Sequence, residues 1–157
     1  MMSTLSSIHM ATEADIVLET RAKRLLVVEC TWMAEPSVAA ATEARDGLAE
    51  LWSIDFEYFM LVFHTELHVW RKDAPAGSGP QFTASATQIW RDYLGKLADS
   101  PMRLRSSAMG IGIAFWLNDL ANNVTKPNPA SDADRLLLKS GLFDQMRGGI
   151  VRRHVPA

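Results

Sequence analysis

Residues 14–32, ADIVLETRAKRLLVVECTW, decide the fold. They predict two β-strands, Ala14 to Glu19 and Arg24 to Trp32, joined by a basic turn. The second strand is apolar at odd and even positions until Glu29, a pattern typical of a strand buried on both faces of a sheet. A carboxylate in such a strand costs on the order of several kcal/mol unless it is paired, hydrogen-bonded or bound to a metal. Glu29 is therefore the first candidate for a functional residue.

Strand and helix patterns alternate along the rest of the chain. We expect further strands at Phe56 to Phe63 and Leu67 to Lys72, and a helix from Ser37 to Trp52 between the two strand pairs. This order predicts a single α/β domain, residues 1–157, with a central mixed sheet flanked by helices. The later segments are a short edge segment at 82–87, helices at 88–97, 104–122 and 132–146, and a basic tail at 150–155 that is either a final strand or a frayed end.

Composition excludes several classes of protein. The net charge of −2 argues against a protein that coats nucleic acid nonspecifically. It is compatible with a local basic patch that binds nucleic acid. The single cysteine, Cys30, excludes an intramolecular disulfide and a cysteine-rich zinc site. No stretch approaches the roughly 18 apolar residues that span a bilayer, and the first residues lack the pattern of a secretory signal. We therefore expect a cytoplasmic protein without a membrane partner.

Several segments together resemble the PD-(D/E)XK nuclease superfamily, the restriction-endonuclease-like fold. The first is an Asp that opens one strand, Asp15, followed by a hydrophobic strand carrying Glu29. EYFMLVFHTELHVWR at 57–71 resembles the hairpin of a bacterial branch of that superfamily, and IAFWLNDLA at 113–121 and SGLFDQMRGG at 140–149 resemble its later blocks. The resemblance implies a nuclease-like core at about residues 13–97 and a C-terminal helical extension at about 98–149.

The resemblance also implies a catalytic site. In active members the Asp and Glu hold Mg²⁺ or Mn²⁺, which identifies Asp15 and Glu29 as metal ligands, with Glu43 and Arg45 around them. The motif lysine, two residues after the Glu, is Thr31 here, and the motif proline before the Asp is Ala14. Two functions follow: a degenerate member that serves as a binding or assembly module, or a metal-dependent DNA endonuclease in defence or repair.

The residues themselves leave a simpler reading open for the acidic pair. Asp15 could cap a turn while Glu29 pairs with a nearby arginine such as Arg45. His64 and His68 bracket the predicted hairpin turn, and two histidines alone make an incomplete metal site, so we expect an ordinary exposed turn there.

The segment from Leu104 to Asn122 is apolar almost all round at helical spacing. Such a helix is either deeply buried or forms a subunit interface, and we expect the second, in a homo-oligomer. The expected interface residues are Met109, Ile113, Trp116, Leu117 and Leu120.

Overall fold

The computed structural model describes residues 13–51, 55–100 and 104–156. Its centre is a six-stranded sheet with the strand order β5-β4-β3-β2-β1-β6. The strands are β1 (Glu13–Glu19), β2 (Arg24–Cys30), β3 (Tyr58–Val62), β4 (Glu66–Arg71), β5 (Phe82–Ser85) and β6 (Ile150–Pro156). All neighbouring strands are antiparallel except β2 and β3, so the predicted α/β class with a mixed sheet is confirmed.

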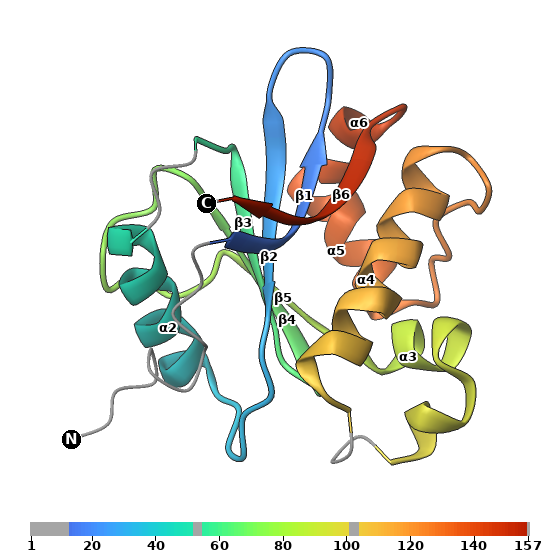
Figure 1. Ribbon diagram of the computed structural model, residues 1–157, viewed down its shortest axis with the longest axis horizontal. Coiled ribbons are helices and arrows are strands. Elements are labelled where there is room, and N and C mark those ends of the chain that lie inside the picture. Colours follow the sequence, from blue (N-terminus) through green and yellow to red (C-terminus); the bar gives the residue numbers. More distant parts are fainter. Residues whose placement is uncertain (1–12, 52–54, 101–103, 157) are drawn as a thin grey trace.

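Helix α2 (Val38–Leu51) makes the crossover between the two parallel strands. A short hairpin makes its two strands antiparallel, so parallel neighbours need a longer crossover connection. The helix presents Ala41, Ala44 and Leu48 to one face of the sheet, where they pack with Val27 and Phe59. Figure 1 shows α2 alone on that side. The predicted end of this helix, Trp52, lies outside the described residues.

The opposite face of the sheet is covered by the remaining helices (Figure 1). These are α3 (Thr87–Tyr93), α4 (Ser106–Ala121), α5 (Asp132–Ser140) and α6 (Leu142–Met146), with a 3-10 turn at Gly95–Asp99. Helix α5 begins where the Ser131 hydroxyl accepts a hydrogen bond from the Asp134 amide, and it ends at Gly141, whose φ of 81° lies in the left-handed region. Serine at the start and glycine at the end are the expected caps.

The short edge segment predicted at 82–87 is confirmed as β5, at one edge of the sheet. Of the two alternatives for the tail at 150–155, the structure has the strand: β6, the other edge, paired with β1. Two expectations change in detail. The strand predicted to end at Trp32 ends at Cys30. The segment predicted as a helical extension is part of the core: side chains of α4, α5 and α6 pack directly on the sheet, together with Ile16 and Val28.

The side chains predicted to form a subunit interface are buried within the chain itself. Met109, Ile113, Trp116, Leu117 and Leu120 are each at most 3% exposed. A helix that is apolar nearly all round can bury any of its sides. Here these side chains pack against the apolar face of the sheet. Their assignment to an interface is wrong. The exposed side of α4 instead carries Ile111 and Phe115, which are 38% and 55% exposed.

The helices formed by the described residues include none with the length and apolar content that a membrane crossing requires.

A buried acidic pair as the candidate functional site

Adjacent strands bring the two predicted acidic residues together. In the antiparallel ladder of β1 and β2, Ile16 lies opposite Val28 and Val17 lies opposite Val27. One further step in this register places Asp15 opposite Glu29. Side chains alternate along a strand, so both lie on the face of the sheet that α2 covers, in line with Val17 and Val27. Directly opposed side chains have Cβ atoms about 5 Å apart, which is contact distance for two carboxyl groups.

Asp15 is fixed by the neighbouring strand. Its Oδ2 accepts a hydrogen bond from the backbone N–H of Cys30 at 2.8 Å. This bond replaces the turn-capping role that the sequence left open for Asp15. The same bond occupies one of the two oxygens of the Asp15 carboxylate with a backbone amide donor.

Glu29 lies deeper, with 3% of its surface exposed. Burial raises the pKa of its carboxyl group to about 10, and the charge and hydrogen bonding of Asp15 add to the increase. Both effects act in the same direction because each disfavours a negative charge on Glu29. Among the described residues, Glu29 Oε2 has no hydrogen-bond partner. At neutral pH the carboxyl group of Glu29 is therefore protonated.

Thr31 does not supply the group that it replaces in the motif. Its side chain is 3% exposed, and its hydroxyl donates to the carbonyl oxygen of Trp32 at 3.4 Å. Its backbone N–H donates to Val62 on β3. Lys23, six residues before Glu29, lies in the turn between β1 and β2, where its Nζ is 3.9 Å from Glu57 Oε1. Neither residue brings a positive charge to the acidic pair.

The two residues expected around the pair lie elsewhere. Glu43 is exposed on α2. Arg45 is buried, but its guanidinium donates to the carbonyl oxygens of Ala74 at 2.6 Å and Pro75 at 3.3 Å. Arg45 therefore holds the loop after β4 against α2. It is not an ion-pair partner of Glu29, so the alternative in which Glu29 pairs with Arg45 is also wrong.

Both histidines are buried, not exposed as predicted. His68 on β4 is 0% exposed; its Nδ1 lies 3.1 Å from Thr83 Oγ1 and its Nε2 lies 3.2 Å from Glu66 Oε1. The contact with Glu66 is short but poorly aligned as a hydrogen bond. Burial lowers the pKa of His68, and Glu66 opposes that shift. His64 stacks on Trp32 with ring centroids 5.5 Å apart.

The acidic pair is a poor fit to a divalent cation. Mg²⁺ requires six oxygen ligands in near-ideal octahedral geometry and keeps several waters, so its site must be open to solvent. Here one oxygen of Asp15 is engaged by Cys30, and both Glu29 and Thr31 are closed to solvent. Within the part of the chain that the structure describes, no group of three or more His, Cys, Asp or Glu side chains is placed to hold a metal ion.

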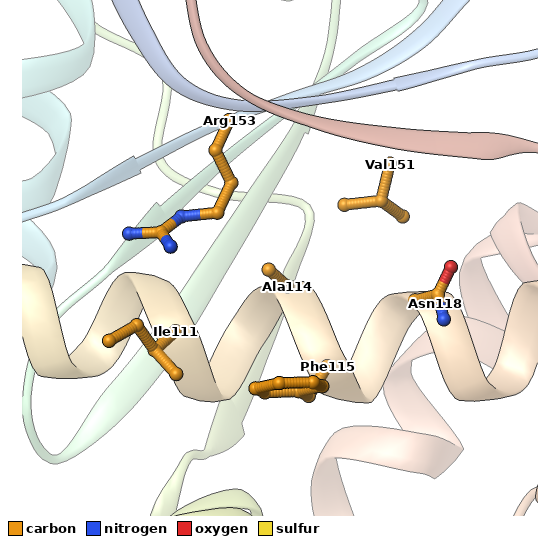
Figure 2. Close-up of a pocket in the computed structure, with 6 residues that line it drawn as sticks. All are labelled: Ile111, Ala114, Phe115, Asn118, Val151 and Arg153. Carbon is orange, nitrogen blue, oxygen red and sulfur yellow. The ribbon is translucent and has the colours of Figure 1, made fainter.

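A second feature, missed from the sequence, is a groove between α4 and β6. It has a volume of about 210 Å³ and is lined by Ile111, Ala114, Phe115, Asn118, Val151 and Arg153. Figure 2 shows Val151 and Arg153 projecting from β6 toward α4. The basic tail was the available signal, but only the pairing of β6 with β1 brings it beside α4.

No family model, curated protein or solved structure matches this chain. The resemblance to PD-(D/E)XK nucleases rests on the quoted segments.

Proposed function

We propose that this protein is a degenerate PD-(D/E)XK-like protein that acts as a binding or assembly module and does not hydrolyse nucleic acid. The observation that carries the proposal is the state of Glu29. A metal-dependent nuclease needs this carboxylate ionised and accessible, whereas here it is closed to solvent and its pKa is raised to about 10. A protonated carboxyl group is a weak ligand for a hard cation.

The residue at the position of the motif lysine supports the same proposal. In the catalytic motif, lysine stabilises the attacking water or the developing negative charge, and such electrostatic groups typically contribute about 100-fold or more to the rate. The residue at this position is Thr31, whose hydroxyl donates a hydrogen bond to the carbonyl oxygen of the next residue, Trp32. With Glu29 protonated and Thr31 in place of the motif lysine, the site lacks both parts of that chemistry.

Cleavage assays with purified protein test this proposal. We expect no cleavage of double- or single-stranded DNA in the presence of Mg²⁺ or Mn²⁺. Cleavage by the wild-type protein that disappears in Glu29→Gln would overturn the proposal and favour the endonuclease, whereas cleavage that persists in Glu29→Gln would come from a contaminant.

The variant Thr31→Lys tests the origin of the inactivity. It restores a charge on the strand face that carries Glu29, and circular dichroism first establishes that the variant folds. Cleavage gained by Thr31→Lys, and lost again when Glu29→Gln is added, would show that the missing lysine disabled an otherwise competent scaffold.

A further inference from the structure

The edge of the sheet at β6 offers an open row of backbone hydrogen-bonding groups. β6 ends the strand order, so on its outer side it pairs with no other strand formed by the described residues. An unpaired edge is a ready template for an additional strand. His154 adopts a φ of 56°, in the left-handed region, so the regular part of the edge is Ile150 to Arg153.

The groove beside this edge is apolar along its floor and charged at one end. Ile111, Ala114 and Phe115 of α4 line it together with Val151 of β6. In Figure 2 Ala114 points toward β6, the Phe115 ring lies along the opposite border of α4, and the Arg153 side chain extends toward α4. A volume of about 210 Å³ accommodates a large apolar side chain. An exposed phenylalanine beside an exposed isoleucine is a surface that gains stability when a partner covers it.

The charge at this edge defines the partner. Arg152 already pairs with Glu19, with 3.2 Å between Nε and Oε2. Arg153 is exposed and makes no ion pair with any residue that the structure describes. A carboxylate at the matching position of an added strand would form a bidentate pair with its guanidinium.

A second copy of this chain does not fit the same edge. Pairing two β6 edges about a two-fold axis would bring Arg152 and Arg153 of both copies into one short ladder. Like charges facing each other across strands are destabilising. Nucleic acid is also disfavoured, because its binding is driven by many cations and this groove is lined by one arginine beside apolar side chains.

Resting on the proposed binding function, we propose that β6 and α4 bind an extended partner peptide that carries an apolar and an acidic residue two positions apart. Val151 and Arg153 both line the groove, so the peptide side chains that meet them lie on one face of the added strand. The peptide adds as a strand to the edge at Ile150 to Arg153. Its apolar side chain enters the groove against Phe115, and its carboxylate pairs with Arg153. Backbone pairing supplies affinity, and the groove and the arginine supply specificity.

Fluorescence polarisation with a labelled peptide in which leucine and glutamate stand two positions apart, with threonine between them, tests this proposal. The same peptide with lysine in place of glutamate is the charge control. We expect the acidic peptide to bind and to lose at least about tenfold in affinity in Phe115→Ser and in Arg153→Glu. Because the ion pair is at the rim, added salt should weaken binding.

Leu97→Ser is the matched control variant. Leu97 is 49% exposed, close to the 55% of Phe115, but it lies in the 3-10 turn and does not line the groove. Binding by this variant should equal that of the wild-type protein. Arg153→Glu should in addition bind the lysine peptide better than the wild-type protein does, which a merely structural role for Arg153 would not produce.

Four results would overturn the inference: no binding of the acidic peptide, equal binding of both peptides, displacement of the acidic peptide by single-stranded DNA, or a dimer that Phe115→Ser dissociates. None of them bears on hydrolysis. Failure of the proposed function would appear separately, as metal-dependent DNA cleavage lost in Glu29→Gln.

Discussion

Glu29→Gln should stabilise the protein at neutral pH, and by more as the pH rises. The folded state keeps Glu29 protonated up to a pKa of about 10, whereas in the unfolded chain the carboxyl group ionises near 4.5. Above pH 4.5 the unfolded state therefore releases a proton that the folded state retains, and unfolding becomes more favourable. Glutamine has the shape of the protonated side chain and no proton to release, so the variant escapes this loss.

The size of the effect follows from the two pKa values. Neutral pH lies about two and a half units above 4.5, and each unit is worth about 1.4 kcal/mol, so the variant should gain about 3–4 kcal/mol at pH 7. The difference should be near zero at pH 4.5 and widen by about 1.4 kcal/mol for each pH unit until about pH 10. Local relaxation or water entry would reduce the slope but not its sign.

Urea denaturation at a series of pH values measures this difference directly. The matched control is Glu43→Gln, the same substitution at an exposed position of α2, which should leave the pH dependence of the unfolding free energy unchanged. A Glu29→Gln variant that is less stable than the wild-type protein at pH 7, or that gains nothing as the pH rises, would refute the reasoning. It would show that Glu29 is ionised in the fold and compensated by a cation.

Two further substitutions test contacts that hold the fold around the pair. Arg45→Met should remove the donors to the Ala74 and Pro75 carbonyls and leave the loop after β4 open to limited proteolysis, with a loss of about 1–3 kcal/mol in the free energy of unfolding. Trp116→Phe should cost a similar amount, about 1–3 kcal/mol by thermal unfolding, because the buried indole Nε1 donates to Asp134 Oδ1 at 2.7 Å and phenylalanine leaves that oxygen without this donor.

The positions of Asp15 and Glu29 could be predicted because the sequence carries a strong local signal there. A carboxylate in a continuous apolar run is conspicuous, and a short basic turn between two strands makes them antiparallel neighbours. The register that places the two residues opposite each other also depends on an irregularity that the sequence did not indicate, because Glu19 pairs with Arg24 whereas Leu18 pairs with Leu26. Nor did the sequence indicate the donor to Asp15, since backbone N–H groups are present at every position and leave no pattern.

The environment of α4 could not be predicted for a different reason. Helix direction and length were clear, but a helix that is apolar nearly all round has no periodicity that selects its buried side. Met109 and Phe115 look equivalent in the sequence, yet one is buried and the other is 55% exposed. The choice depends on β6, whose short run of valine and arginine was compatible with either a strand or a frayed end.

The pairing of β1 with β6 has a consequence for the order of folding. Residues 13–19 form their ladder with residues 150–156, so one of the inner strands of the sheet depends on a segment synthesised more than a hundred residues later. Contacts between such distant segments slow folding, because a long loop must close before they form. On a translating ribosome, the hairpin of β1 and β2 can form early, but the outer edge of β1 stays unpaired until β6 emerges. Folding of this sheet is therefore completed only once β6 is available, and until then the unpaired edge is where a chaperone or a misfolding event would act first.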